Sequence, residues 1–387
     1  MRARPAAALA LAAAALLAGC GSAAPATSGP APEAPPGGAP FLATSLATAS
    51  GTWAVVVMGG SVATEDNFWQ LFVRPAGSST WKLVTPPGTP DNGGLVLADG
   101  GAQSLITGFR PSQYLTYTPL IITRDAGQAW SSAGPLDGAL ANVPDALAAE
   151  PGTGALLALL TDGTAELAAP GYTSWTALVT QRSLAATPAG RRCELQDLTA
   201  ATFAPPGTPL LAGTCHRPGT AGIFAGTGGT WRAAGPAMPA ALAGQDIAVR
   251  RLTQTGQDIA ALLTAGTGPA ASLLVAWSAD DGGHWTLSPP LPLHGAAPAS
   301  ASFGPAGSAA VITTANRAEI IDGTGSSWRP LPPLPPGTAT LAPGPGGAAD
   351  ALAVNRGTLT IWHLAPNATQ WTQGQVIKVP LQYGSSS

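Results

Sequence analysis

The sequence is poor in charged residues. Asp, Glu, Lys and Arg together make up 10% of the 387 residues, and the formal net charge at pH 7 is −3. A chain with this slightly acidic balance lacks the broad basic surface that binds the phosphate backbone of nucleic acids. We therefore expect no nucleic-acid partner.

Patterns that hold metals and nucleotides are also missing. The four histidines, His216, His284, His294 and His363, form no close-spaced ligand set. No glycine-rich loop ends in Gly-Lys-Ser or Gly-Lys-Thr, which excludes a P-loop. The sequence predicts no metal and no cofactor.

Turn-forming residues, by contrast, are abundant. The chain contains 49 glycines and 39 prolines, while 45% of its residues are hydrophobic. That hydrophobic fraction argues against disorder throughout, and the glycine and proline content indicates many tight turns between short strands.

Tryptophan recurs at a nearly regular spacing. Seven of the eleven tryptophans are 43 to 56 residues apart, at Trp81, Trp130, Trp175, Trp231, Trp285, Trp328 and Trp371. A period of roughly 40 to 50 residues in a chain of short strands is the signature of β-propeller blades. No Trp is followed by Asp, which counts against WD40 blades, and four tyrosines are too few for kelch blades.

Two of these tryptophans end the same octet, S/T-x-D-x-G-x-x-W. Each octet predicts a tight turn in which the Asp accepts backbone N–H bonds, the Gly takes a positive φ and the Trp fills an apolar layer. The positions with these structural roles are Thr123, Asp125, Gly127 and Trp130 in one octet and Ser278, Asp280, Gly282 and Trp285 in the other. The octet resembles the Asp-box, or bacterial neuraminidase repeat, of sialidase-like propellers.

Together these patterns predict an all-β protein, a seven-bladed β-propeller of four-stranded antiparallel blades. The propeller is expected to span residues 41–383, with a tail at 384–387. Each marker Trp should open the outermost strand of its blade. The stretch Gln181 to Arg192 is expected to be a long loop between blades, and Phe41 to Ser50 and Val376 to Leu381 are candidates for closing the ring.

The N-terminus is typical of a targeting segment. Arg2 and Arg4 precede an apolar run from Ala6 to Leu16, and Leu17-Ala18-Gly19-Cys20 follows. This order resembles the bacterial lipoprotein signal, which implies removal of residues 1–19 and diacylation of Cys20. The protein would then be lipid-anchored to a cell membrane on its extracytoplasmic side, with residues 20–40 as a disordered tether. An ordinary secretory signal with an incidental cysteine is the alternative.

Two cysteines remain after lipidation. Cys193 and Cys215 form an even pair in an oxidising compartment, so we predict a disulfide that closes a loop of 22 residues. In the chain-entropy model such a loop contributes about 3 kcal/mol. Two buried free thiols are the alternative.

Arginines and tyrosines fall in the loops that share one face of the predicted propeller. Guanidinium groups suit carboxylates, phosphates and acidic sugars, and aromatic rings suit sugar or peptide faces. The candidate ligand-face residues are Arg110, Tyr114, Tyr117, Arg191, Arg192, Arg217, Arg317 and Arg356. They suggest an acidic glycan or an envelope protein as partner of a monomer; a solvated rim of loop charges is the alternative.

The resemblance to sialidases implies an arginine triad, a Tyr–Glu nucleophile pair and a Phe-Arg-Ile-Pro signature. Here Phe109-Arg110-Pro111 lacks the Ile and lies in the second blade, and Tyr383 is the one late tyrosine that could be the nucleophile. Of Arg250 and Arg251, one side chain can point into the channel, because adjacent strand residues point to opposite faces. We therefore predict a non-catalytic binding protein, with a divergent sialidase-like glycosidase or an envelope scaffold as alternatives.

Overall fold

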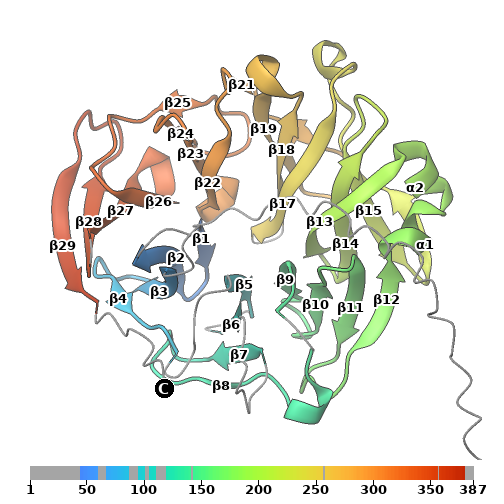
Figure 1. Ribbon diagram of the computed structural model, residues 1–387, viewed down its shortest axis with the longest axis horizontal. Helices are drawn as coiled ribbons and strands as arrows, with labels where there is room; N and C mark the ends of the chain where they lie inside the picture. Colours follow the sequence, from blue (N-terminus) through green and yellow to red (C-terminus); the bar gives the residue numbers. More distant parts are fainter. Residues whose placement is uncertain are drawn as a thin grey trace, which may run out of the picture. The chain divides into compact units, whose positions relative to one another are not determined.

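The computed structural model describes residues 44–59, 67–86, 95–100, 104–109, 119–140, 143–255, 258–355 and 357–379. The predicted signal peptide, Cys20, the tether and the tail at 384–387 lie outside these residues. Almost all regular structure in the described part is β-strand (Figure 1).

The strands follow one another in antiparallel groups of four consecutive strands, which we name after their first strand. The first three groups are β1 (Thr44–Thr48), β2 (Gly51–Gly59), β3 (Asn67–Pro75) and β4 (Lys82–Leu83); β5 (Leu95–Asp99), β6 (Leu105–Phe109), β7 (Leu120–Thr123) and β8 (Ser131–Ser132); and β9 (Ala146–Ala149), β10 (Leu156–Leu159), β11 (Thr164–Ala168) and β12 (Thr176–Thr180). The next two are β13 (Leu195–Ala204), β14 (Thr208–Cys215), β15 (Gly222–Thr227) and β16 (Thr230–Ala233); and β17 (Ile247–Thr255), β18 (Asp258–Ala265), β19 (Ser272–Ser278) and β20 (Thr286–Leu287), with β21 (Leu291–Pro292) also pairing with β19. The last two are β22 (Pro298–Phe303), β23 (Ala309–Thr313), β24 (Ala318–Ile321) and β25 (Arg329–Pro330); and β26 (Thr338–Pro343), β27 (Ala349–Asn355), β28 (Thr358–Leu364) and β29 (Thr372–Lys378).

Single strand pairings join some of these groups into larger sheets. Leu46 of β1 pairs with Phe303 of β22 in parallel, and Thr214 of β14 pairs with Ala248 of β17 in the antiparallel sense. Because β1 and β22 are both first strands, their parallel pairing shows that the two groups start from the same face.

The first strands of the groups lie nearest a common centre, and fourth strands such as β12, β25 and β29 lie at the periphery (Figure 1). Apolar clusters fill the space between neighbouring groups. One contains Leu210 and Ile223 of the β13 group with Ile247, Val249 and Ile259 of the β17 group. Middle strands such as β10 are therefore buried on both faces, which explains their continuous apolar runs.

The sequence prediction of a long loop at Gln181–Arg192 is wrong, because this stretch forms two short helices, α1 (Gln181–Ala185) and α2 (Pro188–Cys193). Thr180 and Ser183 form a capping box at α1, and the Thr187 hydroxyl accepts the Gly190 N–H at α2. No helix within the described residues has the length and apolar character needed to span a bilayer. Short 3₁₀ turns occur at Leu136–Gly138, Ala240–Leu242, Gly268–Ala270, Pro305–Gly307 and Pro345–Gly347.

Each marker tryptophan lies at the start of the fourth strand of its group, as the period predicted. Several of their indoles bind the group that precedes them in the chain. Trp130 Nε1 donates to the Val84 carbonyl over 3.1 Å, and Trp285 Nε1 donates to the Ala234 carbonyl over 2.7 Å. Trp371 Nε1 makes the same type of bond to Pro332, over 3.3 Å. The tryptophan is thus a link between groups as well as an apolar plug.

The indole of Trp81 makes a similar contact, but between the first and the last group of the chain. Trp81 belongs to the β1 group, yet its indole donates to the Asp350 carboxylate of β27 over 2.9 Å. Arg74 Nη1 lies 2.5 Å from the same Oδ2, and His363 Nδ1 lies 2.5 Å from Oδ1. The guanidinium also stacks over the Trp81 ring, 5.5 Å from its centroid. We call Arg74, Trp81, Asp350 and His363 the closure cluster.

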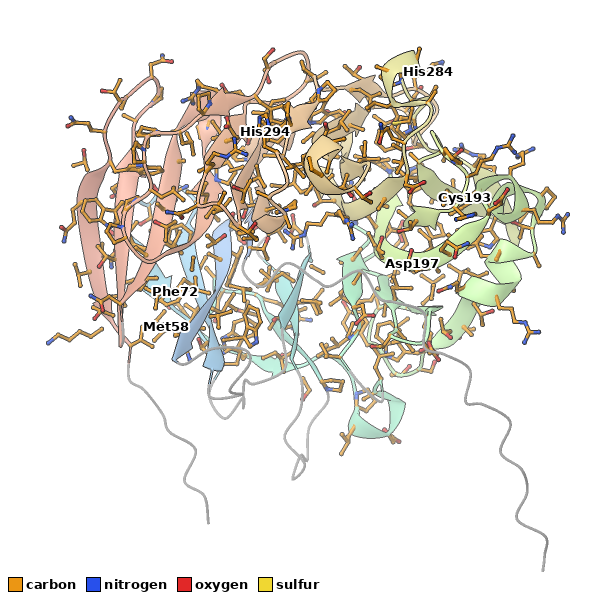
Figure 2. All side chains as sticks on the ribbon, turned by 45° about the horizontal axis from the view of Figure 1, so that its top comes forward. Met58, Phe72, Cys193, Asp197, His284 and His294 are labelled. Carbon is orange, nitrogen blue, oxygen red and sulfur yellow. A yellow bond between two sulfur atoms is a disulfide. The ribbon has the colours of Figure 1, made fainter. Side chains whose placement is uncertain are left out.

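Further contacts accompany the closure cluster. Gln375 of β29 donates to the Trp81 carbonyl over 2.8 Å and accepts the Trp81 N–H over 2.9 Å. Met58 and Phe72, labelled in Figure 2, pack with Leu352 and Ile361 of the β26 group. The first and last groups are therefore joined by side chains. The described parts of the two predicted closing segments belong to the first and last groups themselves: β1 pairs with β2, besides its single pairing with β22, and Val376 belongs to β29, which pairs with β28.

We expect Asp350→Ala to lower the free energy of unfolding by about 3 kcal/mol, since it leaves a mostly buried guanidinium and a buried indole N–H without their acceptor. Urea denaturation followed by tryptophan fluorescence measures this change. Asp246→Ala, at an exposed position, is the matched control and should change stability by less than about 0.5 kcal/mol. Equal effects of the two substitutions would contradict the role of the closure cluster.

Candidate functional site

The octet Thr123–Trp130 forms a braced turn after β7. Asp125 Oδ1 accepts the N–H groups of Gln128 and Ala129 over 3.0 and 2.9 Å, and the Thr123 hydroxyl over 2.8 Å. The Ala129 N–H bond is the largest of the interactions that lower the pKa of Asp125. Gly127 has φ +84°, and a Cβ there would lie 2.6 Å from Cβ of Val84. Glycine is therefore required both by the turn and by the close approach of the preceding group.

The octet Ser278–Trp285 repeats this geometry after β19. Asp280 Oδ1 accepts the His284 N–H over 2.7 Å and the Ser278 hydroxyl over 3.0 Å, while Oδ2 lies 2.5 Å from His284 Nδ1. The hydrogen bond from the His284 side chain is the main cause that lowers the pKa of Asp280 to about 2. Both Asp carboxylates are thus occupied by donors of their own turns, which is a structural role.

A polar network occupies the space between three inner strands. Arg251 of β17 donates through Nη1 to the Thr44 hydroxyl of β1 and, over 2.6 Å, to the Ala301 carbonyl of β22. Burial lowers the pKa of this guanidinium to about 10, although the residue as a whole keeps some exposed surface. Arg250, its neighbour, instead donates to Thr264 over 3.0 Å.

Hydroxyl groups complete this network. The Ser45 N–H donates to the Ser302 hydroxyl over 2.9 Å, and the Ser45 hydroxyl donates to the Leu341 carbonyl of β26 over 2.9 Å. The hydroxyl oxygens of Thr340 and Ser302 are 3.3 Å apart. Arg251 therefore helps to hold inner strands together through groups of the protein itself.

The helices α1 and α2 form an insertion between β12 and β13. Leu184 of α1 and Ala189 of α2 are buried against the β13 group in a cluster that includes Phe224. A Cβ on Gly190 would lie 2.1 Å from the Leu184 carbonyl oxygen, so the two helices meet at a glycine.

A disulfide fixes the insertion to the β13 group. The predicted pair Cys193 and Cys215 is joined, with the two Cα atoms 4.9 Å apart, and links the end of α2 to the end of β14. Beside it, the Arg217 N–H donates to the Cys193 carbonyl over 3.2 Å, and the His216 N–H donates to the Glu194 carbonyl over 3.0 Å. The connection after β14 is thereby held against the end of α2.

Exposed arginines gather on this insertion. We call the surface formed by Arg182 of α1, Arg191 and Arg192 of α2, and Arg217 after β14 the basic insertion; all four residues are exposed. Figure 2 shows nitrogen-tipped side chains projecting from the helices next to Cys193. Glu194 is the acidic residue among them, so the insertion is locally cationic in a protein of net charge −3.

Most arginines in the described part of the chain are engaged by the protein. Arg74 and Arg251 bind as given above, and Arg191, Arg232, Arg317 and Arg329 donate to the backbone carbonyls of Ala186, Asp281, Leu293 and Gly347. Within the described residues, the arginines whose side chains make no hydrogen bond or ion pair are Arg124, Arg182, Arg192 and Arg217. Three of these four belong to the basic insertion.

Only part of the predicted ligand face can be located. Arg191, Arg192 and Arg217 come together on the basic insertion, whereas Arg317 lies in the connection between β23 and β24 and binds Leu293. Arg110, Tyr114, Tyr117, Arg356 and the late Tyr383 lie outside the described residues. No group of three or more His, Cys, Asp or Glu residues within the described ranges is arranged to hold a metal ion.

No protein-family model and no curated protein matches the chain at a significant level. Solved structures do resemble it. A protein from Lactobacillus plantarum aligns with a TM-score of 0.50 and 12% identity, covering 85% of this chain and 96% of its own. For a putative 6-phosphogluconolactonase from Bacteroides uniformis the TM-score is 0.48, with 13% identity and coverages of 85% and 97%. For YCF48 from Cyanidioschyzon merolae it is 0.44, with 12% identity and coverages of 77% and 92%. At such low identity the likeness concerns the fold alone, which is β-propeller-like.

The pKa of Asp280 gives a test of the second octet. The depressed pKa means that the stabilisation of the turn is complete above pH 3.8 and is lost as the pH falls through about 2. We expect the ¹³C carboxyl signal of Asp280 to titrate with a midpoint of about 2, and His284→Ala to move the midpoint towards 3.8. His294→Ala, which removes a histidine outside this turn, should leave it in place. A midpoint that His284→Ala does not raise would refute this origin of the shift.

Proposed function

We propose that this protein is a seven-bladed β-propeller, anchored through lipid at Cys20 on the extracytoplasmic side of a membrane, that binds an anionic partner through the basic insertion and catalyses no reaction. Each four-stranded group is one blade in this proposal. The order of the indole contacts supports a ring, because Trp81 of the β1 group binds the β26 group just as the later tryptophans bind their predecessors.

One observation carries the binding role: Arg182, Arg192 and Arg217 are exposed on the basic insertion, and their side chains have no partner among the described residues. Unpaired guanidinium groups present several donors in a planar fork that suits carboxylates and phosphates. A rigid base for these side chains lowers the entropy lost on binding. Arg74 and Arg251, by comparison, are already engaged by the protein.

The lipid anchor is tested by the chemistry of Cys20. We expect an alkyne analogue of palmitate, fed to the expressing cells, to label the wild-type protein and not Cys20→Ala. The double variant Cys193→Ala/Cys215→Ala is the matched control, because it removes the other two cysteines and should keep the label. Labelling is read on the purified protein by mass spectrometry. A wild-type protein without acyl label, or a labelled Cys20→Ala, would remove the anchor from the proposal.

An activity assay tests the proposal that the protein catalyses no reaction against the sialidase-like alternative. We expect the purified protein to release no fluorophore from a fluorogenic sialoside above the rate of a blank. Arg251 of the inner strand β17 supports this expectation, since its Nη1 already donates hydrogen bonds to Thr44 and Ala301. Hydrolysis that Arg110→Ala abolishes and Arg124→Ala leaves unchanged would establish a divergent glycosidase instead.

A further inference from the structure

The basic insertion and the N-terminal entry of the folded part belong to the same face of the proposed ring. In a group of four antiparallel strands, the first strand starts on the face that carries the connection from the preceding group. The insertion is such a connection, between β12 and β13, and Thr44 is the start of the first strand β1. The segment that follows the proposed anchor therefore joins the ring on the face that bears the arginines.

The length of this segment limits how far the ring can lie from the proposed anchor. Residues 21–43, which number 23, separate Cys20 from Thr44. A chain of that length reaches no more than about 80 Å even when fully extended. A tethered surface meets its target at a high effective concentration, so weak electrostatic attraction is sufficient to orient it.

Charge distinguishes the two faces. Turns on the opposite face, which join first to second and third to fourth strands, carry Asp125, Glu150, Asp280, Asp281 and Asp322 against Arg124 in the described residues. The face of the insertion also carries acidic residues, with Glu194 at the end of α2 and Asp137, Asp145, Asp162 and Asp246 in other connections. Four arginines lie on the basic insertion and Arg317 lies in the β23–β24 connection of the same face, whereas the turns of the opposite face carry more acidic than basic residues.

We propose that the basic insertion binds the anionic phospholipid headgroups of the membrane that carries the anchor, so that the β13 side of the ring lies against the bilayer. This inference rests on the proposed function and names the partner of the same surface. Arg182, Arg192 and Arg217 supply the contacts to headgroup phosphates, since their side chains have no other partner in the described part of the protein. The acidic turns of the opposite face then point away from the bilayer.

The experiment uses the acylated protein in lipid vesicles. Two exposed residues serve as probe sites, one on each face of the β13 side of the ring. Ala186 lies between the two helices, and Thr227 lies at the end of β15 on the opposite face. Each is replaced by cysteine in a separate variant and labelled with an environment-sensitive fluorophore, the native thiols being acylated or disulfide-bonded. The vesicles contain phosphatidylglycerol together with a lipid that carries a spin-label quencher on its headgroup.

We expect strong quenching of the probe at Ala186→Cys and little at Thr227→Cys. The quenching should be lost in vesicles of phosphatidylcholine alone, and at about 1 M salt, where the Debye length is about 3 Å. Arg182→Gln/Arg192→Gln/Arg217→Gln should lose it as well. Arg124→Gln is the matched control, because it removes an unpartnered arginine from the opposite face and should leave the quenching intact.

Other outcomes overturn the inference in distinguishable ways. If the protein floats with the vesicles but Ala186→Cys is not quenched, or both probes are quenched equally, the anchor stands and the orientation is wrong. If the quenching persists in phosphatidylcholine, charge does not drive the contact. If Ala186→Cys is shielded only after an envelope protein or an acidic glycan is added, that molecule is the partner. A protein that does not float at all refutes the anchor itself.

Discussion

The buried carboxylate of Asp350 is the constraint on which the arrangement of the sheets depends. Each four-stranded group is apolar on both faces and stays covered only if it has a neighbour on each side. Most neighbours are held together by the chain that connects them. No connecting segment joins the first group directly to the last. The residues of their contact lie far apart in the sequence: Trp81 is 269 positions from Asp350 and 294 positions from Gln375.

The tryptophan contacts between consecutive groups differ in chemistry from the contact between the first and last groups. Between consecutive groups, the indoles of Trp130, Trp285 and Trp371 donate to backbone carbonyls. At the closing contact, the Trp81 indole donates to a carboxylate that also binds Arg74 and His363. Charge-assisted bonds are roughly twice as strong as neutral ones. Among these four indole contacts, the one to a charged acceptor is therefore found where no connecting segment joins the groups.

Local chemistry explains why much of the fold could be predicted from the sequence. A tryptophan at the start of each fourth strand, and the Ser/Thr, Asp and Gly of two octets, act within a few residues of one another, so spacing alone reveals them. The partners of Asp350 and Arg251 come from distant strands and leave no local pattern. The helices α1 and α2 had a signal, Thr180-x-x-Ser183 and Thr187-Pro188, but their five and six residues are too short to produce an apolar period.

The same reasoning explains the disulfide beside the basic insertion. Helices of five and six residues are not stable alone, since their few hydrogen bonds do not offset the entropy of nucleation. Here α1 is fixed by buried Leu184 and α2 by the bond from Cys193 to Cys215. That bond also holds Arg217 next to the end of α2 through its backbone N–H. The backbone positions that carry the four arginines are thus fixed before any partner binds, so the partner does not have to supply the free energy of ordering them.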